Sequence, residues 1–217
     1  MTNSSFPENG VHFKLLSRLK PAGIRSGLFF DRDGVIVTEV GYLHRIDEIE
    51  FLPNVVEIIR TANSHKVPII IISNQSGIAR GIYGWDDYKL VEEEIVNQLA
   101  NDGAMIDACV ACGTHPKYSS GWTSNDAYWR KPGPGMLRLA AEHIGIKLSS
   151  SWLIGDKFTD VLAAKTANLA GCVHLDTGYG LEDRSAALLE AGPDFEVFPA
   201  SDLAEAKRHL IHKGLFR

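Results

Sequence analysis

Short apolar segments alternate along this chain with stretches whose apolar residues recur at helical spacing. The short segments are bounded by polar or glycine-containing turns, which is typical of buried strands. The predicted strands are residues 26–30, 67–72, 106–111, 152–154, 172–175 and 195–198, and the predicted helices are residues 53–62, 85–100, 135–144, 159–168 and 202–212. This alternation predicts βαβ units, so we expect an α/β fold with a Rossmann-like parallel sheet and helices on both faces.

Three segments fall outside this alternation. Residues 1–26 form a predicted N-terminal arm, in which residues 11–19 carry apolar residues at helical spacing before a Pro-Ala-Gly break. The segment between the first strand and Pro53 is too long for a simple turn, so we expect a small flap over the end of that strand. Residues 113–134 show no periodicity, and such long loops are usually functional. The remaining chain, residues 27–217, is predicted to be one domain.

Composition limits the class and location of the protein. Of 217 residues, 45% are hydrophobic and 23% are charged, as in an ordinary globular protein. With a net charge of −5, the chain lacks the excess positive charge that would attract nucleic acid or an anionic membrane surface. No apolar run is long enough to span a membrane, and residues 1–10 lack the apolar core of a signal peptide. We therefore expect a cytoplasmic protein, as a monomer or a weak dimer. Three cysteines, an odd number, argue against a disulfide framework.

Asp31 and Asp33 directly follow the first predicted strand, in the stretch Leu-Phe-Phe-Asp-Arg-Asp-Gly. Residues two apart on extended backbone point the same way, so both carboxylates should converge at the strand's tip, where open α/β sheets bind ligands. Adjacent carboxylates repel each other and favour a hard cation such as Mg²⁺ between them. On these residues alone, an Asp-Gly turn that closes a hairpin explains the stretch about equally well.

Three further polar groups stand at strand ends or just before helices. Ser73 and Asn74 follow the second predicted strand and offer a hydroxyl and backbone N–H groups to a phosphate. Arg130 and Lys131 place two cations in an aromatic loop. Asp156 follows the fourth strand, in Gly-Asp-Lys-Phe-Thr-Asp, and can serve as a metal ligand. Each group has an ordinary alternative, respectively a helix N-cap, a solvated charge pair and a capping aspartate.

The order of these groups resembles the four motifs of the haloacid dehalogenase superfamily of phosphotransferases. The motifs are Asp-x-Asp-Gly, a serine after a second apolar strand, a lysine before a helix, and Gly-Asp-x-x-x-Asp. The resemblance implies that Asp31 is a nucleophile and Asp33 a general acid/base, with an aspartyl-phosphate intermediate. It also implies that Ser73 and Lys131 hold the transferring phosphoryl group. The implied Mg²⁺ ligands are Asp31, the backbone carbonyl of Asp33, and Asp156.

A closer resemblance is to the D-glycero-D-manno-heptose 1,7-bisphosphate 7-phosphatases, with the histidinol-phosphate phosphatases as near relatives. It rests on Asp31-Arg32-Asp33-Gly34, Gly41-Tyr42, Ser73-Asn74-Gln75-Ser76-Gly77-Ile78-Ala79-Arg80-Gly81, Arg130-Lys131-Pro132 and Gly155-Asp156-Lys157. The resemblance implies that there is no large cap domain and that the substrate is a small phosphorylated sugar, a lipopolysaccharide precursor. The implied substrate-binding residues are Arg32, Glu39, Val40, Gly41, Tyr42, Asn74, Gln75, Ser76, Arg130 and Lys157.

One departure from that family concerns the long loop. Members of the family commonly bind zinc there through three cysteines and a histidine. The corresponding positions here are Cys112, Thr114, Ala127 and Trp129. Cys109 and His115 do not complete a four-donor set, because Cys109 and Cys112 should face opposite sides of a strand. We therefore expect no structural zinc, and we expect aromatic residues to shape the loop by packing. These residues are Tyr118, Trp122, Tyr128 and Trp129.

Other functions fit the sequence less well. A receiver-type signalling module is also phosphorylated on an aspartate, but receivers are shorter and carry that aspartate on another strand. The second and third predicted strands here end near Ser73 and Cys112. A binding protein without activity would not need every charged motif residue that this chain keeps. Among enzymes, a histidinol-phosphate or other sugar-phosphate phosphatase is the alternative.

Overall fold

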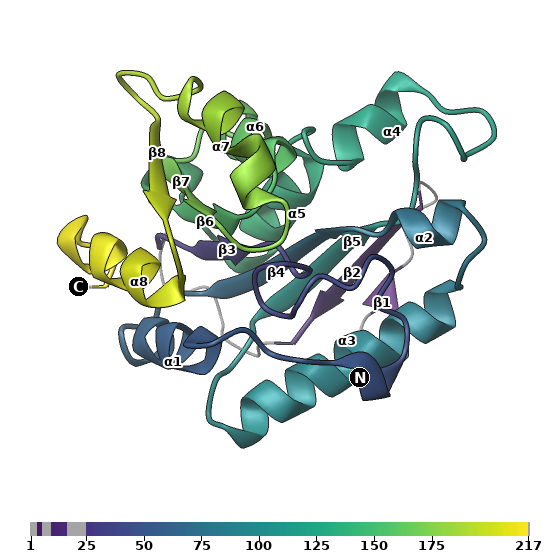
Figure 1. Ribbon diagram of the computed structural model, residues 1–217, viewed down its shortest axis with the longest axis horizontal. Helices are drawn as coiled ribbons and strands as arrows, with labels where there is room; N and C mark the ends of the chain where they lie inside the picture. Colours follow the sequence, from purple (N-terminus) through teal and green to yellow (C-terminus); the bar gives the residue numbers. More distant parts are fainter. Residues whose placement is uncertain (1–3, 6–9, 17–24, 217) are drawn as a thin grey trace.

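The strands form one mixed sheet in a computed structural model that describes residues 4–5, 10–16 and 25–216 (Figure 1). Within these residues the sheet has eight strands in the order β1-β2-β5-β4-β3-β6-β7-β8. The strands are β1 Ser4–Ser5, β2 Val11–Leu15, β3 Leu28–Phe30, β4 Ile69–Asn74, β5 Ala108–Cys112, β6 Trp152–Gly155, β7 Gly171–Leu175 and β8 Glu196–Ala200. Neighbouring strands from β5 to β8 are parallel, while β1 and β2 add an antiparallel edge. The predicted α/β fold is confirmed.

Helices cover both faces of the sheet (Figure 1). They are α1 Val55–Ser64, α2 Ser76–Ala79, α3 Trp85–Asn101, α4 Ser124–Trp129, α5 Gly135–Ile144, α6 Phe158–Thr166, α7 Gly180–Leu188 and α8 Leu203–His212, with 3-10 turns η1 Ile46–Glu48 and η2 Leu148–Ser150. Apart from Tyr88 of α3, the buried apolar side chains of α1, α3 and α8 belong to one cluster, and those of α5, α6 and α7 belong to a second cluster on the opposite face. No helix in the described residues is long and apolar enough to cross a membrane.

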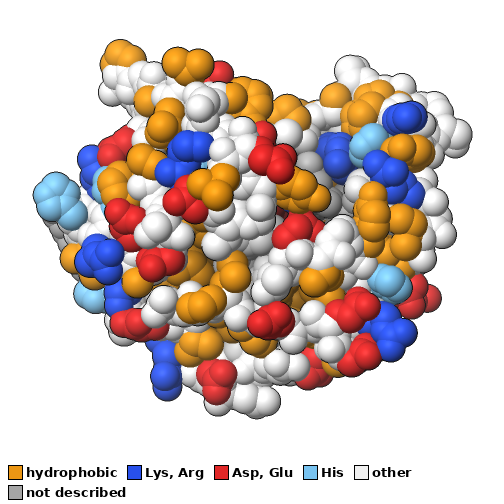
Figure 2. Space-filling model, in the orientation of Figure 1, with side chains coloured by type: hydrophobic (Ala, Val, Ile, Leu, Met, Phe, Trp, Pro, Cys, Tyr) orange, Lys and Arg blue, Asp and Glu red, His pale blue; other side chains and the backbone are white. Residues whose placement is uncertain are grey.

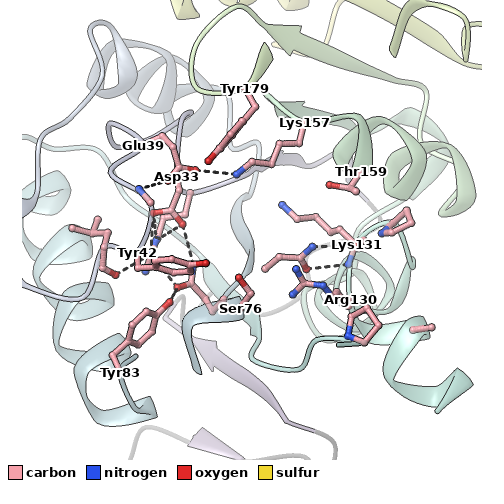
Figure 3. Close-up of a pocket in the computed structure, with 18 of the residues that line it drawn as sticks. Asp33, Glu39, Tyr42, Ser76, Tyr83, Arg130, Lys131, Lys157, Thr159 and Tyr179 are labelled. Carbon is pink, nitrogen blue, oxygen red and sulfur yellow. Dashed lines mark hydrogen bonds and ion pairs between the residues drawn. The ribbon is translucent and has the colours of Figure 1, made fainter. Parts of the chain in front are cut away.

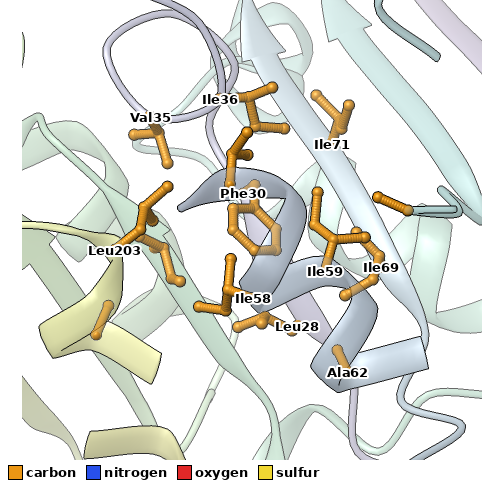
Figure 4. Packing of buried hydrophobic residues seen from close by; sticks show 14 of the residues in the cluster. Leu28, Phe30, Val35, Ile36, Ile58, Ile59, Ala62, Ile69, Ile71 and Leu203 are labelled. Carbon is orange, nitrogen blue, oxygen red and sulfur yellow. The ribbon is translucent and has the colours of Figure 1, made fainter. Parts of the chain in front are cut away.

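The central strand β3 is anchored on both of its faces. Leu28 and Phe30 pack in the cluster that contains α1 (Figure 4), whereas Phe29 packs in the opposite cluster. This alternation follows from the pleat of a strand. Each of these side chains is fully buried, and each such burial contributes about 1.5–3 kcal/mol. The end of β3, which carries Asp31, is therefore held in a fixed place.

The N-terminal prediction of helical spacing was wrong for residues 11–15, which form strand β2. This strand pairs antiparallel with the edge of β5. Val11 and Phe13 are buried, and their spacing of two suits a strand. A short isolated helix is only marginally stable, whereas the edge of β5 offers backbone hydrogen bonds to these residues. Strand pairing therefore determines their secondary structure. Much of the predicted arm lies outside the described residues, and its division from the domain at residues 26 and 27 stays a prediction.

Three helices of the described chain, α2, α4 and α7, were not predicted from the sequence. The start of α4 is a capping box, in which Asp126 N–H donates to Thr123 Oγ1 at 3.4 Å and Thr123 N–H donates to Asp126 Oδ2 at 2.8 Å. A Thr-x-x-Asp pattern is a recognisable helix start. In contrast, α7 buries only Gly180 and Ala187, so it has little apolar periodicity to detect.

Candidate active site

The predicted acidic pair lies where three parallel strands end together. β3 pairs with β4 on one side and with β6 on the other. The ends of these strands bring Asp31, Ser73 and Asp156 to one edge of the sheet. The backbone N–H of Asp31 donates to the carbonyl of Ile154 in β6 at 2.9 Å, which extends the strand pairing up to the carboxylate.

Asp31, Asp156 and Asp160 form a buried group of carboxylates. One oxygen from each lies within 4.8 Å of the others. Burial, together with the charges of Asp31 and Asp160, raises the pKa of Asp156 to about 8, and burial also raises the pKa of Asp31. Asp156 Oδ1 is buried and has no hydrogen-bond partner in the described part of the chain. Crowded oxygen donors, one of them unpartnered, fit a hard divalent cation.

Lys131 supplies the positive charge beside these carboxylates. Its Nζ lies 2.9 Å from Asp31 Oδ1 and 2.6 Å from Asp160 Oδ1. Burial lowers the pKa of Lys131, but Asp160 and Asp31 outweigh this effect and raise it overall, so the lysine is charged. Asn74 fixes its backbone, accepting from Lys131 N–H at 3.0 Å and donating to its carbonyl at 2.9 Å. Asn74 therefore orients Lys131 from the end of β4.

The prediction from sequence left Asp160 out of the site. Its Oδ2 accepts from Lys157 N–H at 3.1 Å and so caps α6, while its other oxygen pairs with Lys131. The pattern that marks it was present, because Asp160 is the second acidic residue of the Gly-Asp-x-x-x-Asp motif. Asp156 lies in the turn between β6 and α6, and Asp160 lies in the first turn of α6, so the two carboxylates come together where the chain enters the helix.

Asp33 accepts hydrogen bonds from three side chains, those of Arg32, Gln75 and Ser73. Arg32 donates to Asp33 Oδ1 through Nη2 at 2.9 Å and Nε at 3.1 Å. Gln75 Nε2 donates to Asp33 Oδ2 at 3.0 Å, and Ser73 Oγ lies 3.5 Å from the same oxygen. Gln75 Oε1 in turn accepts from Arg32 at 3.1 Å and from the Tyr83 hydroxyl. The polar atoms of Arg32 and Gln75 are thus largely engaged with Asp33 and with each other.

A cavity of about 570 Å³ opens at this site (Figure 3). The predicted site residues that line it are Arg32, Asp33, Glu39, Gly41, Tyr42, Asn74, Gln75, Ser76, Arg130, Lys131 and Lys157. Asp31, Ser73 and Asp156 are buried and do not line it. Val40 is not brought to the cavity, because its side chain turns to solvent and is 50% exposed. The lining residues that were not predicted are Leu43, Tyr83, Pro116, Trp122, Ala127, Pro132, Thr159 and Tyr179.

An ion pair joins the predicted flap to the opposite wall of the cavity (Figure 3). Lys157 Nζ donates to Glu39 Oε2 at 3.0 Å, and Glu39 Oε1 accepts from Gly41 N–H at 2.7 Å. The same ammonium lies 4.7 Å from the centre of the Tyr179 ring. Burial lowers the pKa of Lys157, but Asp31, Asp156 and Glu39 outweigh that effect and raise it. The positive charge of Lys157 is therefore stabilised at the edge of the acidic group.

Basic side chains gather on the rim near α2 and α4, beside a hollow in the surface (Figure 2). Arg80 stacks over the Tyr118 ring, with its Cζ 3.9 Å from the ring centre. The pKa of His115 is lowered by burial and by the charges of Arg130, Arg80 and Lys117. This local positive charge can attract an anion although the whole chain carries a net negative charge.

The long loop shows the aromatic contacts that the sequence led us to expect. The rings of His115 and Tyr118 lie 4.8 Å apart, and those of Tyr128 and Trp129 lie 5.1 Å apart. Cys109 and Cys112 are buried free thiols that pack in clusters on opposite faces of the sheet. Two donors on opposite faces do not fit one tetrahedral zinc site. That no structural zinc binds elsewhere in the loop stays a prediction.

This fold and this site define a class of protein, the HAD-like hydrolases. A family model described as HAD-hydrolase-like matches residues 128–206. A D-glycero-beta-D-manno-heptose-1,7-bisphosphate 7-phosphatase from Mesorhizobium japonicum is 35% identical over 178 residues, which cover 82% of this chain and 77% of that protein. A D-glycero-alpha-D-manno-heptose-1,7-bisphosphate 7-phosphatase from Photorhabdus laumondii is 38% identical over 70% of this chain and 82% of its own length.

Solved structures agree with these relatives. A HAD-like phosphatase from Mesorhizobium loti superimposes with a TM-score of 0.84 at 29% identity, covering 99% of this chain and 98% of that one. D,D-heptose 1,7-bisphosphate phosphatase from B. bronchiseptica, solved with magnesium and phosphate, gives a TM-score of 0.73 at 27% identity, covering 86% and 99%. The chain therefore belongs to the haloacid dehalogenase (HAD) superfamily, in the family of the D-glycero-D-manno-heptose 1,7-bisphosphate 7-phosphatases, and it is a phosphatase.

Proposed function

We propose that this protein is a Mg²⁺-dependent phosphomonoesterase that removes the 7-phosphate of D-glycero-D-manno-heptose 1,7-bisphosphate through an aspartyl-phosphate. One observation carries the proposal. The buried carboxylates of Asp31, Asp156 and Asp160 share one site with Lys131, next to a cavity lined by Asp33. Phosphoryl transfer depends mainly on positioning and on charge neutralisation, and this arrangement supplies both. We also propose a cytoplasmic location and a monomer or weak dimer, on sequence grounds alone.

The chain's own residues divide the reaction into two displacements. A carboxylate oxygen of Asp31 attacks phosphorus, the bond from phosphorus to the sugar oxygen breaks, and Asp33 donates its proton to that oxygen. Asp33 then takes a proton from a water molecule, whose oxygen displaces Asp31 and releases inorganic phosphate. Lys131 neutralises the equatorial oxygens of the phosphoryl group, with Ser73 as a hydrogen-bond donor.

The acidic group fits Mg²⁺, and Asp31 and Asp156 are the carboxylates that would hold it. The unpartnered Oδ1 of Asp156 offers a free ligand atom, and the backbone carbonyl of Asp33 would add another donor. Asp160 already contacts Lys131 and Lys157 N–H, so its main part is to orient Lys131. When bound, Mg²⁺ supplies charge neutralisation between the carboxylates and the phosphoryl oxygens.

The choice of a bisphosphate rests on cations at two separated places. Lys157 stands beside the acidic group, whereas Arg130 and Arg80 belong to the basic rim. A substrate with a phosphate at each end can engage both places through charge-assisted hydrogen bonds. Glu39, Gly41 and Tyr42 of the flap, with Ser76, would contact the sugar between them.

A substrate panel tests the proposal. With Mg²⁺ present, we expect kcat/KM for the heptose bisphosphate to exceed that for fructose 1,6-bisphosphate and for histidinol phosphate by about 100-fold, since a site built for one set of polar groups rejects analogues that leave them unpaired. Activity should disappear with EDTA and return with excess Mg²⁺. A higher kcat/KM for histidinol phosphate would replace the proposed substrate, and full activity in EDTA would remove Mg²⁺ from the proposal.

Replacing Gly178 by alanine is expected to weaken Mg²⁺ binding. A Cβ on Gly178 would lie 2.1 Å from Asp156 Oδ2, so the carboxylate must move. Disturbing the support of a metal ligand commonly costs about 10–100-fold in affinity, and we expect a loss in that range when Mg²⁺ binding is measured by calorimetry.

Gly81→Ala is the matched control for Gly178→Ala. Both glycines have positive φ, 70° at Gly81 and 54° at Gly178, but a Cβ at Gly81 meets no atom within 4 Å. The control therefore carries the backbone strain without the clash. Equal Mg²⁺ affinity in the two variants would show that the approach to Asp156 is unimportant.

A further inference from the structure

A chain of buried polar contacts links the active site to strand β2, and the proposed reaction does not use it. It begins at Arg32, which is 2% exposed and holds Asp33. It continues through Tyr88 and Glu92 of α3 and ends at His12 of β2. Tyr88, Glu92 and His12 are all buried, although they lie outside the cavity lining.

The first contact lies between Arg32 and the ring of Tyr88. Arg32 uses Nε and Nη2 for Asp33, Gln75 and the carbonyl of Leu43. Its Nη1 is buried and has no hydrogen-bond partner among the described residues. The Arg32 Cζ lies 5.4 Å from the centre of the Tyr88 ring, within the range of a cation–π contact. The Tyr88 ring thus stabilises the Arg32 guanidinium, which has one nitrogen without a hydrogen bond to any residue that the structure describes.

The second contact fixes that ring. The Tyr88 hydroxyl donates to Glu92 Oε2 at 2.8 Å. Burial and the charge of Glu92 raise the pKa of Tyr88 well above its ordinary value, so the hydroxyl keeps the proton that it donates. When a phenol donates a hydrogen bond to a carboxylate, electron density shifts toward its ring. The more electron-rich ring attracts a cation more strongly.

The third contact stabilises the buried carboxylate of Glu92 through side chains of β2. Glu92 is 3% exposed, and a buried charge without compensation is strongly destabilising. His12 Nε2 lies 3.2 Å from Glu92 Oε1, and Lys14 Nζ lies 3.9 Å from the same oxygen. His12 and Lys14 both belong to β2, so the strand that sequence periodicity misassigned places an imidazole and a lysine charge beside the carboxylate.

We propose that Glu92 is a positioning residue for the proton transfer by Asp33. It acts through Tyr88 and Arg32, and His12 of β2 completes the chain. Arg32 fixes the direction of the Asp33 carboxyl group. Glu92 fixes the Tyr88 ring, which contacts Arg32. The inference rests on the proposed role of Asp33 as the proton donor to the leaving oxygen.

The test compares two esters that differ in their need for that proton. The alkoxide of a sugar must be protonated as it leaves, whereas p-nitrophenolate leaves without help. We expect Glu92→Gln and Tyr88→Phe to lower kcat/KM for the heptose bisphosphate about tenfold, within the range of general acid catalysis. The value for p-nitrophenyl phosphate should stay within about twofold, and KM for the bisphosphate should not change. The ratio of the two kcat/KM values from one preparation does not depend on the fraction folded.

Two reference variants separate the possible failures. Glu196 lies on the distant strand β8, and its carboxylate pairs with Nε2 of His209 at 3.1 Å. Glu196→Gln therefore also removes a carboxylate that pairs with a histidine, but it should leave the ratio unchanged. Asp33→Asn should lower the ratio more than Glu92→Gln does. If Asp33→Asn leaves the ratio unchanged, the proposed role of Asp33 fails. If Asp33→Asn lowers the ratio while Glu92→Gln and Tyr88→Phe do not, or lower both esters equally, the role of Glu92 is overturned.

Discussion

The Asp31→Asn variant is expected to lose turnover of every phosphate ester by a factor on the order of 10⁴ or more, as when a covalent nucleophile is removed. Asparagine has nearly the same shape as aspartate, but its amide cannot accept the phosphoryl group. The variant also loses the negative charge that pairs with Lys131 at 2.9 Å. Phosphate release from the bisphosphate and from p-nitrophenyl phosphate, followed over hours at saturating substrate, measures the loss.

An Asp47→Asn variant is the matched control for this loss. Asp47 lies in η1 on the flap, its side chain is 69% exposed, and it contacts Arg45 at the surface. It should keep wild-type activity. Circular dichroism of both variants checks that the fold is intact. Turnover by folded Asp31→Asn within about tenfold of the wild type would contradict the assignment of the nucleophile.

The Lys131→Met variant is expected to lose both activity and stability. Lys131 is buried and contacts Asp31 and Asp160, and methionine fills a similar volume without charge. Removing one partner of a buried ion pair destabilises a protein by about 3–5 kcal/mol, because the remaining charge is left without compensation. Loss of the cation that faces the phosphoryl oxygens should lower kcat by about 10²–10³-fold. Urea unfolding in EDTA and steady-state kinetics with Mg²⁺ measure the two effects.

Lys207→Met provides the comparison on the surface. Lys207 pairs with Glu57, whose side chain is 59% exposed, so its loss should cost no more than about 1 kcal/mol and leave kcat unchanged. Mg²⁺ should restore part of the stability of Lys131→Met, since it would take over compensation of the carboxylates. Equal unfolding free energies for the two lysine variants would contradict the buried ion-pair network.

The place of the site could be predicted from the sequence because it depends on strand ends. Asp31, Ser73 and Asp156 each follow a short apolar run, and parallel strands bring their carboxyl ends to one edge. The structure places all three there. The phosphatase class followed from the same motifs, and the relatives confirm it.

Other features depend on contacts that periodicity does not encode. The apolar residues of 11–19 recur at helical spacing along the sequence, whereas pairing with the edge of β5 makes residues 11–15 a strand. Asp160 belonged to a recognised motif, but its role beside Lys131 depends on the path of the loop before α5. The pairing of Glu92 with His12 joins residues 80 positions apart, so no local pattern indicates it.

The stereochemical course at phosphorus tests the central claim most directly, namely that Asp31 carries the phosphoryl group between two displacements. The substrate would be a thiophosphate ester made chiral with one heavy oxygen isotope, hydrolysed by the wild-type enzyme with Mg²⁺ in water of a second heavy isotope. Each in-line displacement inverts the configuration, so two displacements should give inorganic thiophosphate with overall retention. Inversion would show that water attacks the substrate directly, and Asp31 would then not be a nucleophile.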